Sequence, residues 1–117
     1  SLAENTPITL SFDCARFGDY AADLPVSILG SGTFKSGKVD AKGEGLVDVS
    51  ASGTSFAITP EYCPPYANAV VNKPWSRIVL SIEGAGPDTQ IIWDAVHMAT
   101  TNKSEIRLRL DNILITK

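Results

Sequence analysis

The stretch Ser76-Arg77-Ile78-Val79-Leu80-Ser81-Ile82-Glu83 is the clearest β-strand in this sequence, and it decides the fold class. Ile78, Leu80 and Ile82 alternate with residues that are mostly polar, and side chains two positions apart share one face of a strand. The same period of two recurs in residues 6–12 and 46–51. The chain therefore predicts strands rather than helices.

Shorter apolar runs, bounded by glycine, serine and proline, complete this pattern. They are read as strands at residues 24–29, 33–35, 39–42, 55–59 and 89–96. Ser36-Gly37 is read as a turn between two of them. Residues 89–96 are apolar on both faces, which favours a central or doubly covered strand, although residues 95–100 also suit a short helical turn. Eight or nine short strands with little or no helix predict an all-β antiparallel sandwich or jelly roll, as one domain spanning residues 1–117.

The last predicted strand, residues 105–115, changes phase part-way along. Its apolar alternation runs through Leu110 and resumes at Ile113, one residue out of step. Such a shift turns every later side chain to the opposite face of the sheet. A β-bulge at Asp111-Asn112 restores the register, and we predict one there.

Composition bounds the class of protein. The chain has 117 residues, of which 44% are hydrophobic and 20% charged, with a net charge of −3. This is a globular composition without the positive charge that favours nucleic acid, and no apolar run is long enough for a membrane-spanning helix. The start Ser1-Leu2-Ala3 suits a processed chain, and Asn102-Lys103-Ser104 is a glycosylation sequon. These features favour a secreted or cell-surface location.

The two cysteines, Cys14 and Cys63, match no zinc-ligand spacing. In a secreted chain they would form a disulfide that closes a loop of about 49 residues and contributes about 4 kcal/mol to stability. In a reducing compartment they would be two buried free thiols. We expect the disulfide.

Motifs of common enzymes are missing from the sequence. There is no nucleophile elbow, no Walker A motif and no dinucleotide fingerprint. Gly30-Ser31-Gly32 and Gly43-Glu44-Gly45 lie between predicted strands and are read as turns. His97 follows an apolar strand and is expected to be structural. The sequence therefore predicts a protein that is not an enzyme.

The proline-rich region at residues 60–74 holds the best candidates for a binding site. Its aromatic rings could stack on the C–H face of a sugar, while nearby amides bind hydroxyl groups, and loops on a rigid sandwich commonly carry recognition. The alternative is that these rings only cover the end of the core. The predicted ligand-binding residues are Tyr62, Tyr66, Asn68, Asn72 and Trp75.

The closing run from Arg107 to Ile115, Arg-Leu-Arg-Leu-Asp-Asn-Ile-Leu-Ile, resembles the last strand of β-jelly-roll carbohydrate-binding modules. The resemblance implies a β-sandwich that binds carbohydrate, with a structural calcium held by Asp111. Calcium takes oxygen ligands, and the acids considered with Asp111 are Glu4, Asp13, Asp88 and Asp94. The alternative is that these acids are solvated residues on outer strand faces.

A secreted, non-catalytic, carbohydrate-binding module is thus the first hypothesis. The second is a structural or assembly subunit, such as a pilus, coat, capsid-decoration or adhesin domain, because short strands can pair with a neighbour. The third is an inhibitor or effector that binds a protein partner through residues 60–76. Trp93 is expected in the core, whereas Phe17 is placed in a possible loop.

Overall fold

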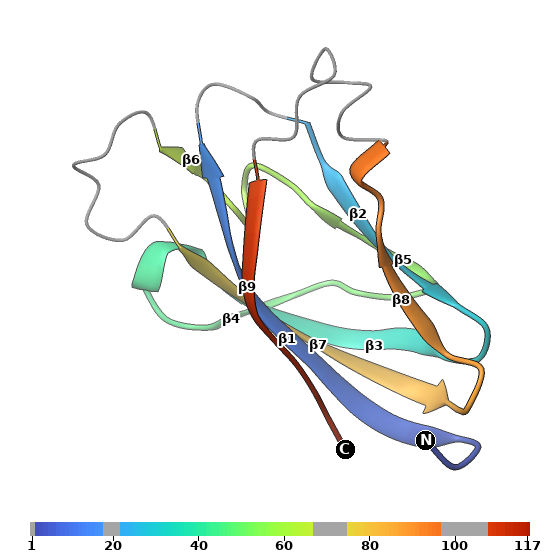
Figure 1. Ribbon diagram of the computed structural model, residues 1–117. Coiled ribbons are helices and arrows are strands. Elements are labelled where there is room, and N and C mark those ends of the chain that lie inside the picture. The colour runs from blue at the N-terminus through green and yellow to red at the C-terminus, as the bar shows by residue number, and fades with distance from the viewer. Residues whose placement is uncertain (1, 18–21, 67–74, 97–107) are drawn as a thin grey trace.

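The computed structural model describes residues 2–17, 22–66, 75–96 and 108–117, and it is a β-sandwich (Figure 1). In the larger sheet the strand order is β4-β3-β7-β1, and β6 and β9 both pair with β1. The smaller sheet has the order β5-β2-β8. Among the described strands, all pairings are antiparallel except the short one between β1 and β6. The predicted all-β antiparallel sandwich is confirmed.

The predicted run at residues 24–29 keeps its bounds, whereas the runs at 33–35 and 39–42 belong mainly to one continuous strand. The described strands follow one another in chain order. They are β1 (Thr6–Phe17), β2 (Leu24–Leu29), β3 (Thr33–Asp40), β4 (Val47–Val49), β5 (Ser55–Ile58), β6 (Pro65–Tyr66), β7 (Ser76–Ala85), β8 (Gln90–Trp93) and β9 (Leu108–Thr116). A 3-10 turn, η1 (Ala41–Gly43), connects β3 to β4. Phe17 therefore ends a long strand, and its placement in a loop was wrong.

The core lies between the two sheets and follows the alternation of the sequence. Leu10 of β1 lies opposite Leu80 of β7, and both side chains are fully buried. Val26 contributes from the smaller sheet, and Phe12 meets Trp93 edge-on with ring centroids 5.7 Å apart. Burying an aliphatic or aromatic side chain of this size contributes roughly 1.5–3 kcal/mol. Trp93 is half-buried against this core.

Ser36-Gly37 is not a turn, because β3 runs unbroken through both residues. Gly37 is buried, and a Cβ there would lie 3.1 Å from side-chain carbons of both Leu80 and Val49. The glycine is needed for close packing, and the local irregularity is a register shift between Phe34 and Ser36. Glycine inside a strand often marks such a close approach.

The strand at β8 is also placed differently from its prediction. It lies at an edge of the smaller sheet rather than in its centre, and the outward Ile92 is exposed. The apolar residues on both faces of β8 therefore do not mean that both faces of the strand are covered. Ala95 and Val96, which follow the strand, have helical backbone. This agrees with the alternative prediction of a helical turn at residues 95–100, of which the structure describes these two residues.

The predicted β-bulge in the last strand is confirmed. Ser11 pairs with Leu114 and Asp13 pairs with Asp111, so two residues of β9 lie opposite Phe12 alone. One of them, Asn112, has a φ of 51°. Asparagine tolerates this left-handed conformation better than most residues. The bulge keeps the apolar residues on both sides of it facing the core side of the sheet.

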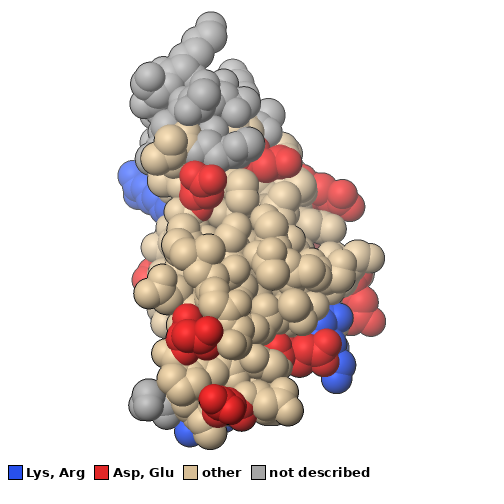
Figure 2. Space-filling model, turned by 90° about the vertical axis from the view of Figure 1, so that its right-hand side faces the viewer, with Lys and Arg blue, Asp and Glu red and all other residues tan. Residues whose placement is uncertain are grey.

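Figure 2 looks at the side of the molecule where β2, β5 and β8 lie, and its middle is largely uncharged, with acidic residues toward the margin. In the parts of the chain that the structure covers, no helix has the length and apolar character needed to cross a membrane.

Candidate functional site

Tyr62 is held by a tight turn at the end of β5. The backbone N–H groups of Tyr62 and Cys63 both donate to the Thr59 carbonyl, at 3.2 and 2.9 Å. The Tyr62 ring stacks on Phe56 of β5, with centroids 5.5 Å apart and planes 10° apart. One face of the ring is thus fixed against the core, which immobilises the side chain before any ligand arrives.

The same tyrosine lines an open hollow of about 210 Å³, here named the Tyr62 hollow. Its walls come from the end of β3, η1, β4 and the turn after β5. The lining residues are Val39, Ala41, Glu44, Gly45, Val47, Val49, Glu61 and Tyr62. Two valines of β4 supply apolar surface, and Val47 is 64% exposed. The hollow thus combines one aromatic ring, an apolar wall and two carboxylates.

The segment that carries Glu44 is fastened to the end of β3. The Gly45 N–H donates to Asp40 Oδ1 at 3.0 Å, and Gly45 has a φ of 104°, which favours glycine. Glu44 and Glu61 are both exposed, and among the described residues neither takes part in an ion pair. Their oxygens are available to accept hydrogen bonds from a ligand in the hollow.

Of the predicted ligand-binding residues whose side chains the structure describes, Tyr62 lines this hollow and Trp75 does not. Tyr66 lies in β6, paired with Phe17, and Trp75 is exposed immediately before β7. Asn68 and Asn72 lie outside the described residues. The prediction missed Glu44 and Glu61. Glu61 adjoins Tyr62 in the sequence, whereas Glu44 was read only as part of a glycine turn.

Arg16 holds this end of the sandwich together. It is fully buried on the inward face of β1, and its guanidinium donates to three backbone carbonyls. Nε reaches Cys63 at 2.8 Å, Nη1 reaches Ala22 at 2.6 Å and Nη2 reaches Ile58 at 3.2 Å. Burial lowers the pKa of Arg16 from its usual value. The inward position of Arg16 follows from the alternation of β1, once that strand is extended to Phe17.

Cys14 and Cys63 are buried free thiols in this structure, so the predicted disulfide is not shown. The fold nevertheless brings them together from distant positions in the chain. Two effects raise the pKa of the Cys14 thiol well above its ordinary range. The larger is a hydrogen bond with Cys63, and the second is burial, which disfavours the charged thiolate. Both thiols thus adjoin the Arg16 network, since Arg16 binds the Cys63 carbonyl.

Among the described residues, no set of calcium ligands is shown around Asp111. Asp111 lies opposite Asp13 across β1 and β9, but both oxygens of Asp13 already accept hydrogen bonds. Arg77 donates to Oδ1 at 3.0 Å and Asn112 donates to Oδ2 at 2.7 Å. In the described part of the chain, no cluster of three or more histidine, cysteine or acidic residues is placed to hold a metal. The calcium remains a prediction of the resemblance.

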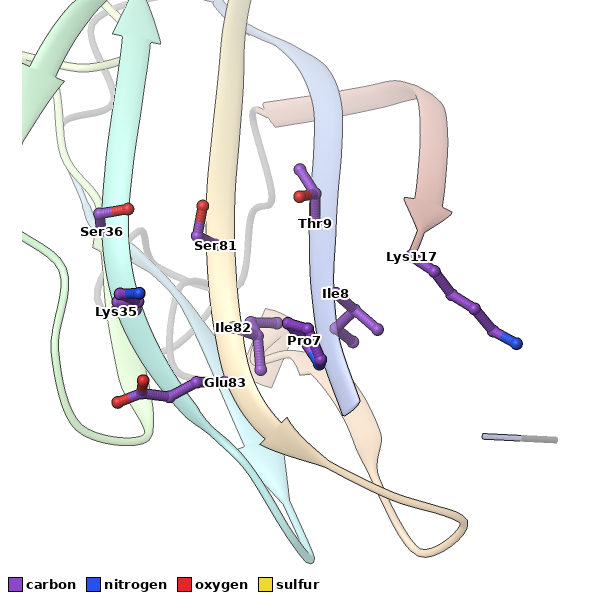
Figure 3. A pocket seen from close by; sticks show the side chains of 9 residues that line it. All are labelled: Pro7, Ile8, Thr9, Lys35, Ser36, Ser81, Ile82, Glu83 and Lys117. Carbon is purple, nitrogen blue, oxygen red and sulfur yellow. The ribbon is translucent and has the colours of Figure 1, made fainter. Parts of the chain in front are cut away.

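A second hollow, of about 380 Å³, lies on the outer face of the larger sheet (Figure 3). The figure shows Ser36, Ser81 and Thr9 in a row across β3, β7 and β1, in agreement with their strand pairing. Lys35, Glu83 and Lys117 add charges around this row. Among the residues that the structure describes, no aromatic side chain lines this hollow, so these residues offer hydroxyl groups without a stacking platform.

The comparisons with known proteins add no identification. No family model, no curated protein and no solved structure matches this chain.

Proposed function

We propose that this protein is a non-catalytic carbohydrate-binding module whose binding site is the Tyr62 hollow. The single observation that carries the proposal is that a ring fixed on Phe56 lines a hollow together with Glu44 and Glu61. A sugar ring presents C–H groups to an aromatic face and hydroxyl donors to carboxylates. Hydrogen bonds to an ionised acceptor are roughly twice as strong as neutral ones.

The charge of the hollow selects the class of sugar. Glu44 and Glu61 would repel a uronate or a sulfated sugar, and the chain as a whole carries a net charge of −3. Neutral hexoses or pentoses supply the hydroxyl donors without that repulsion. The hollow is smaller than the roughly 300–1,000 Å³ of typical drug-sized sites, so it suits one sugar unit of a longer chain.

Arg16 and the Thr59 turn support the proposal because they hold the tyrosine's backbone in place. Arg16 binds the carbonyl of Cys63, the residue after Tyr62, and Thr59 accepts two hydrogen bonds from the same turn. A site that is ordered before binding loses less conformational entropy when the ligand arrives. We expect little movement of this turn on binding.

Affinity electrophoresis in soluble neutral glucans, mannans, galactans and xylans tests the proposal, with a polyuronate as the charged comparison. We expect retardation by at least one neutral polysaccharide and weaker retardation by the polyuronate. Tyr62→Ala should weaken binding by about tenfold or more, because it removes the stacking surface, whereas Tyr62→Phe keeps the ring and should retain most of it.

Ser81→Val, in the outer-face hollow, is the matched control and should bind like the unmodified chain. If Ser81→Val loses binding and Tyr62→Ala does not, the site is wrong although the function stands. If no polysaccharide retards the protein, the function itself is refuted.

We also propose that the chain acts outside the cell, where Cys14 and Cys63 become a disulfide. The cysteines are not at disulfide distance in the structure, but a hydrogen bond between Cys14 and Cys63 and the burial of both side chains support the proposal. Exchange with a small-molecule disulfide such as oxidised glutathione balances the step. One Sγ–Sγ bond forms in the protein, and the glutathione disulfide takes up two electrons and two protons to give two thiols.

A further inference from the structure

Among the side chains that the structure describes, the charges that line the Tyr62 hollow have one sign. Its lining includes Glu44 and Glu61 but no described lysine, arginine or histidine. The hollow on the outer face of the larger sheet differs, because Lys35 and Lys117 line it together with Glu83 (Figure 3). Carboxylates without a neighbouring cation favour a ligand that brings its own positive charge.

The two carboxylates come from distant parts of the chain. Glu44 directly follows η1, and Glu61 lies in the turn after β5. Both side chains are exposed, and within the described part of the chain neither forms an ion pair. An ammonium group that enters the hollow therefore meets carboxylates that no described cation occupies, and it has three hydrogen-bond donors to offer them.

The Tyr62 ring adds a second attraction for a cation. The ring stacks on Phe56, with centroids 5.5 Å apart, and it also lines the hollow. The π-system of a tyrosine attracts an ammonium group, more strongly when that group has lost part of its water. Val47 and Val49 contribute apolar surface that suits the C–H groups of a sugar. The hollow thus combines features that attract a cation with features that accept a sugar ring.

Acidic side chains alone do not give this combination. A hollow of about 350 Å³ beside the first turn of the chain is lined by Glu4 and Asp88. Among the described residues no aromatic side chain lines it, and Asp88 already accepts a hydrogen bond from Ser31 at 3.1 Å. The Tyr62 hollow differs because it joins carboxylates that have no described cationic partner to an aromatic ring.

We propose that the Tyr62 hollow prefers an amino sugar, whose free amine is protonated, to the neutral sugar of the same configuration. The inference rests on the proposed function, since it concerns the ligand of the same site. The ammonium group pairs with Glu44 or Glu61 while the C–H face of the sugar ring packs on Tyr62. Acetylation of the amine removes the charge and with it the advantage. The affinity of the site should fall from amino sugar to neutral sugar to uronate.

NMR titration of isotope-labelled protein with monosaccharides at neutral pH tests the inference. Glucosamine, galactosamine and mannosamine are each compared with the parent hexose and with the N-acetylated form. We expect at least one amino sugar to bind about fivefold more tightly than its parent, because an exposed ion pair or a cation–π contact contributes a factor of up to about five. The amide signals that shift should include those of Glu44, Gly45 and Tyr62. Butylamine, which carries the same charge without a sugar ring, should bind more weakly than the amino sugar.

Three glutamine variants locate the effect. Glu44→Gln and Glu61→Gln should each lower the preference for the amino sugar by about two- to fivefold. They should change the affinity for the parent hexose less, because an amide oxygen still accepts a hydrogen bond. The matched control is Glu4→Gln in the other acidic hollow, which removes the same single negative charge and should keep the full preference.

The outcomes separate this inference from the proposed function. It is overturned if no amino sugar binds more tightly than its parent hexose, or if butylamine binds as tightly as the amino sugar. It is overturned equally if Glu4→Gln lowers the preference as much as the two variants in the Tyr62 hollow. Retardation by a neutral polysaccharide would then show that the proposed function stands without the preference. Failure of every sugar, in titration and in electrophoresis, would refute both.

Discussion

Arg16→Met should cost far more stability than an ordinary surface substitution. Arg16 is fully buried and gives three hydrogen bonds, of 2.6 to 3.2 Å, to carbonyls of Ala22, Ile58 and Cys63. Each hydrogen bond from a charged donor contributes about 1.5–3 kcal/mol, and removing a buried cation returns part of this by ending its desolvation. The acceptors remain behind in the interior. We expect a net loss of about 3–5 kcal/mol.

This loss is a large share of the total. A chain of this length has a free energy of unfolding of roughly 6–18 kcal/mol, and the midpoint of thermal unfolding should fall by roughly 10–20 °C. Urea unfolding followed by tryptophan fluorescence measures the change. Arg16→Lys should lose nearly as much, because one ammonium group cannot reach three carbonyls that lie around a planar guanidinium.

Arg77→Met is the matched control. Arg77 is an exposed arginine that forms a single ion pair with Asp13 at 3.0 Å, and such surface pairs contribute about 0–1 kcal/mol. If Arg16→Met and Arg77→Met cost the same, the Arg16 network does not stabilise the fold and our reasoning is refuted. The Arg16→Met variant should also bind glycan more weakly than the unmodified chain, even at temperatures below its unfolding midpoint. The reason is that Arg16 binds the backbone carbonyl of Cys63, the residue after Tyr62.

Two further predictions concern cysteine oxidation and pH. Protein oxidised with glutathione disulfide should have a free energy of unfolding about 4 kcal/mol higher than the reduced protein, because a bond between Cys14 and Cys63 closes a loop of about 49 residues. Equal urea midpoints for the oxidised and reduced proteins would contradict this prediction. The Ser31 hydroxyl donates a hydrogen bond of 3.1 Å to Asp88, and this bond lowers the pKa of the Asp88 carboxyl group. The ionised carboxylate therefore stabilises the fold at pH values above the ordinary carboxyl pKa of about 3.9. This stabilisation is lost as the pH falls through the lowered pKa of the folded state. Ser31→Ala should raise the Asp88 pKa in an NMR titration of side-chain carboxyl carbons, and an unchanged value would show that Ser31 is not the cause.

Much of the fold could be predicted from local pattern. The alternation around Ile78, Leu80 and Ile82 predicted a strand with one buried face, and the phase change between Leu110 and Ile113 predicted the bulge. Both follow from the two-residue period of a strand, which depends only on neighbouring residues. Gly37 was misread, because a glycine that avoids a clash with Leu80 and Val49 looks in sequence like a glycine in a turn.

The candidate site was predicted only in part, because it joins distant segments. Tyr62 was singled out from its loop, but Glu44 reaches the same hollow from the segment between β3 and β4. No pattern in the nearby sequence predicts that Glu44 lies beside the same hollow as Tyr62. Arg16 was missed for a related reason, since a charged residue at an inward strand position is read as a break in the strand until its carbonyl partners are known.

By itself the sequence determined that this chain forms short antiparallel strands with one apolar face, and it located the bulge that keeps β9 in phase. Those features arise from steric and hydrophobic preferences that act over a few residues. Only the tertiary structure decided that Tyr62 and Glu44 line one hollow, that Cys14 and Cys63 lie close together, and that Ile113, Leu114 and Ile115 are half-exposed. These outcomes depend on which strands pair and on how far one sheet covers the other, and both are set by the packing of the whole core.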